Sequence, residues 1–148
     1  MTKRILAFIL MVYFGPAPAT AQSDRELVYS AVEDYVEALY RVEPERIKRS
    51  VHPNLTKRGF WRPNGTKKYE PESTMTFEEL LDLAAKWNAQ KRLPIDAPKK
   101  IEIYDVQDQT ATAKLTAEWG TDYLQLAKYG AKWMIVNILW QSHPSKSN

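Results

Sequence analysis

The sequence predicts one α+β domain in which helices pack against an antiparallel sheet. Apolar residues recur at helical spacing in the segments before residue 100, and they alternate at strand spacing after it. The length of 148 residues, 44% of them hydrophobic, suits a single core and is too short for two ordinary domains. Helices that precede the strands, rather than alternate with them, are typical of an antiparallel sheet covered by helices on one face.

The first helix is predicted to run from residue 23 to about residue 40. Ser23 and Glu26 form the pattern of a capping box, in which each side chain accepts the backbone N–H of the other residue. An apolar stripe at helical spacing follows, consisting of Leu27, Val28, Ala31, Val32, Tyr35, Val36, Ala38 and Leu39. A second, shorter helix opens at Pro44, where a missing N–H costs no hydrogen bond, and we expect it to end at His52-Pro53.

Residues 55–69 are predicted to form a small hairpin. Turn residues at 63–65 separate the β-prone runs at 59–61 and 67–69. The third helix begins at Thr76, which forms a second capping box with Glu79, and is expected to continue to about Gln90.

The last third of the chain predicts a four-stranded antiparallel meander. Apolar and polar residues alternate along residues 100–106 and 110–119. The runs 121–128 and 132–141 follow, joined by a tight turn in which Gly130 supplies a positive φ. The three helices and the small hairpin are expected to pack on this curved sheet.

The first 21 residues are predicted to be a signal peptide. Lys3 and Arg4 precede an uninterrupted apolar run at 5–14, and small residues stand before a cleavage site between Ala21 and Gln22. As a helix this run spans about 15 Å, half of the hydrocarbon core, so we expect no stable membrane anchor after cleavage. The expected domain is therefore residues 22–148, exported to a bacterial periplasm or secreted.

Composition excludes several kinds of site and partner. The chain has no cysteine, which rules out disulfides, thiol nucleophiles and cysteine-ligated metals, and export without cysteine favours a bacterial periplasm. The formal net charge of +3 includes Lys3 and Arg4, so the mature domain is close to neutral and no nucleic-acid binding is expected. Two distant histidines without paired carboxylates predict no metal site, and we expect no cofactor.

Three segments carry a resemblance to a known family: residues 35–40 (YVEALY), residues 51–53 (VHP) and the last hairpin, with TDYLQL at 121–126 and GAKWMIVN at 130–137. They resemble the nuclear transport factor 2-like superfamily, in particular its SnoaL-like branch of putative lumazine-binding proteins. The resemblance implies a cone-shaped fold with a pocket at its open end, and homodimers joined through the sheet. The superfamily includes enzymes and non-catalytic binding proteins, so the fold alone decides no activity.

The register of the last hairpin predicts a candidate polar site. A turn at Tyr129-Gly130 places Asp122 opposite Asn137, on the same face as Leu124, Leu126, Trp133, Ile135 and Leu139. Burial on that face would raise the pKa of Asp122, whose carboxylate is then a candidate general base or ligand anchor. The alternatives are a buried polar pair with a purely structural role, or an aspartate at the strand end that holds the turn at Gly120.

The opposite face of the hairpin is also apolar. It carries Tyr123, Met134, Val136, Ile138 and Trp140. Because a sheet with two apolar faces must be covered on both, we expect a homodimer joined through this face. The alternative is a monomer with exposed aromatic side chains.

Pocket residues are predicted from the aromatic side chains and the hairpin. The candidates are Tyr35, Trp61, Trp87, Leu124, Trp133 and Asn137, which would stack a small planar apolar ligand. The alternative is that the aromatic rings only fill the core or a dimer interface. His52 is either an acid or base at the pocket mouth or a cation at a helix end, and His143 is expected to be solvated.

Three functions remain open from the sequence. We favour an exported, pocket-bearing protein that binds a small molecule or acts as an accessory to a partner, without catalysis. The second is a cofactor-free isomerase, dehydratase or cyclase with Asp122 or His52 as general base, for which no convincing pair of oxyanion donors is found. The third is a structural dimerisation module whose pocket is filled by its own side chains.

Overall fold

The computed structural model describes residues 22–145. The predicted signal peptide, residues 1–21, lies outside the described residues, so cleavage and export stay predictions. Within the described part of the chain, no helix combines the length and the apolar character needed to cross a membrane.

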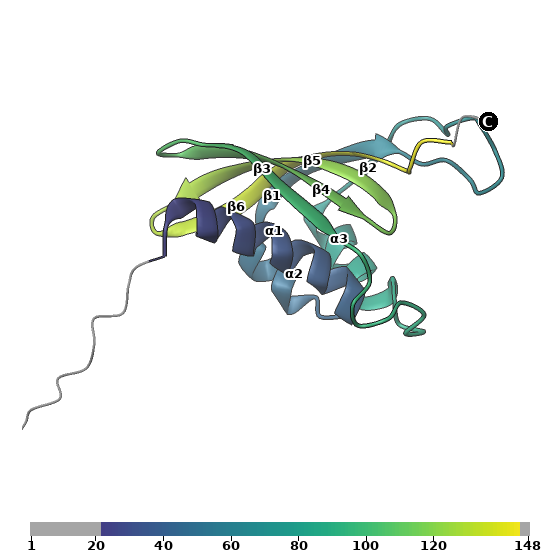
Figure 1. Cartoon of the computed structure of the whole chain (residues 1–148), viewed down its shortest axis with the longest axis horizontal. Helices are drawn as coiled ribbons and strands as arrows, with labels where there is room; N and C mark the ends of the chain where they lie inside the picture. The colour runs from purple at the N-terminus through teal and green to yellow at the C-terminus, as the bar shows by residue number, and fades with distance from the viewer. Residues whose placement is uncertain (1–21, 146–148) are drawn as a thin grey trace, which may run out of the picture.

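Three helices lie on one face of a curved, six-stranded sheet (Figure 1). The helices are α1 (Asp24–Arg41), α2 (Glu45–Ser50) and α3 (Phe77–Lys86). The strands are β1 (Val51–Phe60), β2 (Ser73–Met75), β3 (Lys100–Val106), β4 (Thr110–Ala117), β5 (Gly120–Tyr129) and β6 (Lys132–Gln141), in the order β2-β1-β6-β5-β4-β3. The predicted α+β class is confirmed.

Both predicted capping boxes are formed, at the N-termini of α1 and α3. The apolar stripe of α1 is buried against the sheet as expected, with Val28, Val32, Tyr35 and Val36 fully buried. Helix α3 ends at Lys86, earlier than predicted. The Asn88 amide donates to the carbonyl of Tyr40 at 2.7 Å and accepts two backbone N–H groups further along the chain, which favours a turn over a further helical turn.

The predicted hairpin at residues 55–69 and the helix end at His52-Pro53 are wrong. The chain enters β1 directly after α2, and β1 pairs in parallel with β6 and antiparallel with β2. The buried positions along β1 include Leu55, Lys57 and Gly59. Because a lysine and a glycine occupy inward positions, the sequence of this strand lacks the alternation of apolar and polar residues that predicts a strand. Pro53 falls where the register with β6 shifts, a position that tolerates the missing N–H.

The predicted pairing of Asp122 with Asn137 is also wrong. Near the turn, Leu126 pairs with Ile135, but the next pair is Gln125 with Asn137, so β6 contains one extra residue at this point. Such a bulge reverses which side chains point inward beyond it. Asp122 therefore pairs with Trp140.

The bulge changes the composition of both faces of β6. Ile138 and Trp140, predicted for the dimer face, lie on the helix side, where Ile138 is fully buried. Leu139, predicted to face inward, is exposed and pairs with exposed Tyr123 on the outer face. The outer face is therefore less apolar than predicted, and the homodimer stays a prediction.

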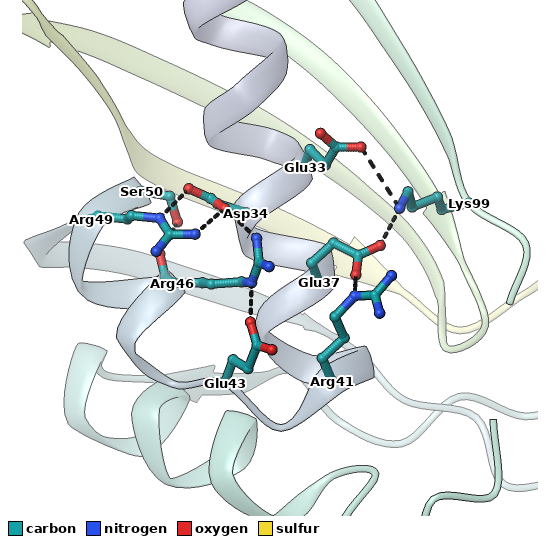
Figure 2. Close-up of polar contacts among 9 residues, drawn as sticks. All are labelled: Glu33, Asp34, Glu37, Arg41, Glu43, Arg46, Arg49, Ser50 and Lys99. Carbon is teal, nitrogen blue, oxygen red and sulfur yellow. Dashed lines mark hydrogen bonds and ion pairs between the residues drawn. The ribbon is translucent and has the colours of Figure 1, made fainter. Parts of the chain in front are cut away.

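An ion-pair cluster joins α1 to α2 and to the loop before β3 (Figure 2). Asp34 on α1 accepts hydrogen bonds from Arg46 at 2.8 Å and from Arg49 at 2.7 Å, both on α2. Glu37, one helical turn later, pairs with Lys99 and with an arginine on its own helix. The cluster fixes α2 against α1, which sets the direction in which β1 leaves α2.

We expect this cluster to make the protein less stable in acid. Burial tends to raise the pKa of Asp34, but hydrogen bonds from Arg49 and Arg46 outweigh it and lower that pKa; the pKa of Glu37 is lowered in the same way. A lowered carboxyl pKa contributes stability above its unfolded value, about 3.9 for Asp and 4.3 for Glu, and that contribution is lost as pH falls through the lowered value.

Asp34→Asn should lower the free energy of unfolding at pH 7 by about 1 kcal/mol, because the pair is partly exposed to solvent. The variant should also lose part of the acid dependence. Urea unfolding at pH 7 and pH 3 measures both effects. Asp82→Asn is the control, since its ion pair with Lys86 is largely exposed. Equal losses of stability in the two variants would contradict the conclusion that the ion pairs of Asp34 stabilise the fold.

Candidate functional site

A cavity of about 460 Å³ opens between α3, the end of α1 and one end of the sheet. Its wall is formed by Leu39, Lys57, Trp61, Arg62, Asn64, Met75, Leu83, Trp87, Glu118, Trp119, Trp140, Ser142 and His143. Figure 1 shows the segment between β1 and β2 and the C-terminal end of β6 leaving the sheet together at this end. Four tryptophans from four different segments thus surround one space.

An aromatic cluster holds two of these tryptophans in place. Trp87 and Trp119 meet edge to face with ring centroids 5.3 Å apart, and Tyr40 stacks on Trp87 at 5.9 Å. The Tyr40 hydroxyl donates to the carbonyl of Pro98 at 2.8 Å and accepts the N–H of Glu118 at 3.0 Å. These bonds fix the turn between β4 and β5, and therefore the position of Trp119.

A glycine allows the third tryptophan to reach the wall. Gly59 is the register partner of Trp140, and a Cβ at residue 59 would lie 2.2 Å from Cδ1 of that indole. Any side chain at residue 59 would therefore displace the ring.

Hydrogen bonds join the segment after β1 to the C-terminal segment. The N–H of Arg62 donates to the hydroxyl of Ser142 at 3.0 Å, and its guanidinium donates to the carbonyl of His143 at 2.8 Å. Nε2 of His143 lies 2.8 Å from the carbonyl oxygen of Ala117. His143 is exposed, as expected, but these non-local contacts place it in the cavity wall, which the sequence did not predict.

Three titratable side chains meet at the inner side of the cavity. Lys57 lines the wall yet is only 5% exposed, and its ammonium donates to the hydroxyl of Tyr35 at 2.6 Å. Asp122 is fully buried, and its Oδ2 accepts the indole N–H of Trp119 at 3.0 Å. Within residues 22–145, its Oδ1 has no hydrogen-bond partner.

Burial shifts the pKa of each member of this group. It raises the pKa of Asp122, although the charge of Lys57 and the hydrogen bond from Trp119 act in the opposite direction. It lowers the pKa of Lys57, against the opposing effect of the Asp122 charge. Burial and the neighbouring carboxylate both raise the pKa of Tyr35. A polar centre with perturbed groups beside a cavity is typical of functional sites.

The structure separates the predicted pocket residues. Trp61 and Trp87 line the cavity, and Tyr35 contacts it only through Lys57. The others lie elsewhere: Leu124 is in the core, Trp133 donates its indole N–H to Asp24 at 2.9 Å, and Asn137 bonds Gln125 at 3.1 Å on the outer face.

Neither candidate base lies in the cavity wall. His52 belongs to β1, where its ring stacks on Tyr129 at 4.7 Å and its Nδ1 accepts the N–H of Asn54 at 3.1 Å. Asp122 lies behind the wall formed by Lys57 and Trp119. Among the described residues, no group of three or more histidine or acidic side chains is arranged to hold a metal ion.

Sequence reasoning missed the central polar residue of the site, Lys57. The sequence contains a signal for this residue: Lys57 stands two residues after Leu55 and two before Gly59, and all three positions are buried on the same face of the strand. A lysine at an inward strand position is a marker of a buried polar site, but only the assignment of β1 makes it visible.

Comparison with known proteins places the chain in a family. The sequence model of the family described as "Putative lumazine-binding" matches residues 23–141. The chain belongs to this family. No protein with a curated description matches the chain.

Solved structures similar to this family member share its fold. An NTF2-like protein of unknown function from Shewanella baltica is 18% identical with a TM-score of 0.58, covering 82% of this chain and 95% of that one. One from Silicibacter pomeroyi is 15% identical with a TM-score of 0.60, covering 82% and 100%. A de novo designed protein with a curved β-sheet is 19% identical with a TM-score of 0.50, covering 78% and 97%. The chain therefore has the NTF2-like fold.

Proposed function

We propose that this protein binds a small planar apolar molecule in the cavity walled by tryptophans. The observation that carries the proposal is the convergence of Trp61, Trp87, Trp119 and Trp140 on a space of about 460 Å³. Ligand pockets typically measure about 300–1,000 Å³ and are lined by apolar and aromatic side chains. Indole faces stack well on flat rings.

The family description agrees with the planarity of the proposed ligand, because lumazine is a flat bicyclic heterocycle. The volume of the cavity argues against a pocket filled by its own side chains. Binding is preferred to catalysis because the two candidate bases, Asp122 and His52, do not contribute to the wall.

Trp61→Ala should weaken ligand binding without unfolding the protein. Trp61 is 53% exposed, so its removal costs little stability. Loss of one stacking wall should lower the affinity for the neutral probe N-phenyl-1-naphthylamine, whose naphthalene ring is flat, about 5- to 30-fold, equivalent to about 1–2 kcal/mol. The fluorescence of the bound probe measures the change.

Tyr104→Ala is the matched control, since Tyr104 is 56% exposed and does not line the cavity. The control should bind the probe as tightly as the unmodified chain. Failure of the unmodified chain to bind the probe, or an equal loss in both variants, would contradict the proposal.

A further inference from the structure

The ammonium group of Lys57 has hydrogen-bonding capacity that its neighbours do not use. A lysine ammonium carries three N–H donors, and here one of them bonds Tyr35 at 2.6 Å. Across residues 22–145, no carboxylate lies within ion-pair distance of Lys57 Nζ. Because Lys57 lines the cavity, a ligand bound there can accept hydrogen bonds from the remaining N–H groups of its ammonium.

The surroundings of Lys57 favour an added negative charge. A buried cation is costly unless it is paired and hydrogen-bonded, and the side chain is only 5% exposed. The ring of Trp140, whose centroid is 5.8 Å from Nζ, supplies a cation–π contact but no acceptor oxygen. Asp122 influences Lys57 through its charge, while its Oδ2 is bonded to Trp119.

A second donor in the wall is also unused. Arg62 donates through Nη1 to the carbonyl of Thr66 and through Nη2 to that of His143, but its buried Nε has no acceptor within the described chain. Among the described residues of the wall, Glu118 is the one acidic residue, and it is exposed, so water and salt screen its charge. The polar part of the wall therefore offers donors to a ligand.

We propose that the cavity selects planar aromatic ligands that carry a carboxylate, and that the carboxylate binds Lys57 while the ring stacks between the tryptophans. This inference rests on the proposed function and adds a carboxylate group to the planar apolar ring system proposed there. Hydrogen bonds between an ammonium and a carboxylate are about twice as strong as neutral ones, and they are strongest where water is excluded.

Two probes of the same shape test the inference. Calorimetry on the full chain should show 2-naphthoate binding about 10- to 100-fold more tightly than the neutral 2-naphthamide. Lys57→Met should remove this preference. Lys132→Met, which removes the same charge from an exposed residue at the far end of β6, should retain it.

A measurement on the unmodified chain covers the case in which Lys57→Met fails to fold. Because burial lowers the pKa of Lys57, the affinity for 2-naphthoate should fall with rising pH, and the fall should begin at lower pH than for an ordinary lysine. The affinity for 2-naphthamide should not change. The other titratable groups here are Tyr35 and Asp122 beside the ammonium, and Arg62, Glu118 and His143 in the wall.

The outcomes separate the two proposals. If the neutral probes bind but 2-naphthoate shows no advantage, or if Lys57→Met keeps the advantage, the inference is overturned and the proposed function stands. If neither naphthalene probe nor N-phenyl-1-naphthylamine binds, the proposed function itself fails.

Discussion

Asp122→Asn is expected to lower the free energy of unfolding at pH 7 by about 3 kcal/mol. Asparagine keeps the size of the side chain and an oxygen that accepts the indole N–H of Trp119, so the substitution removes mainly the charge. Lys57 would then remain as a buried cation and lose the favourable charge of Asp122, which acts on it without a direct ion pair. Guanidinium unfolding measures the loss.

The double variant Lys57→Met with Asp122→Leu tests the cause. Replacing both charges by apolar side chains removes the uncompensated cation, so the double variant should recover most of the stability lost in Asp122→Asn. A loss below about 1 kcal/mol in Asp122→Asn would show that Asp122 does not balance Lys57.

The pH dependence of Asp122→Asn gives a further check on the same substitution. Between the lowered pKa of Lys57 in the folded protein and about 10.4 in the unfolded chain, the unfolded chain binds more protons at this residue. Stability from this group therefore rises with pH in that range. Removing the Asp122 charge lowers the pKa of Lys57 further, so the rise should begin at lower pH in the variant.

Gly59→Ala is expected to lower the free energy of unfolding by about 3 kcal/mol or more, at the upper end for overpacking. The added methyl would lie 2.2 Å from the indole Cδ1 of Trp140 and 2.3 Å from its carbonyl oxygen. The backbone oxygen cannot move away without disturbing the β1–β6 pairing. Displacement of the indole should also weaken binding of N-phenyl-1-naphthylamine.

Gly65→Ala is the control for this substitution. Gly65 has a φ of 80°, but a Cβ there would meet no atom within 4 Å. It should therefore lose only about 1 kcal/mol, from the left-handed conformation, and keep its affinity for the probe. Similar stability losses in the two variants would contradict the role of Gly59 in seating Trp140.

The sequence by itself determined the parts of this protein that depend on neighbouring residues. The capping boxes at Ser23 and Thr76, the apolar stripe of α1 and the approximate positions of β3 to β6 all follow from patterns within a few residues. Those patterns predicted the α+β class correctly.

The tertiary structure alone decided the composition of the site. The parallel pairing of β1 with β6 brings Lys57 beside Tyr35, from a different part of the chain, and nothing local to either residue indicates it. The extra residue in β6 moves Trp140 into the cavity and Asn137 out of it. A shift of one residue exchanges the two faces of a strand, so contacts between distant segments determine which side chains a ligand meets.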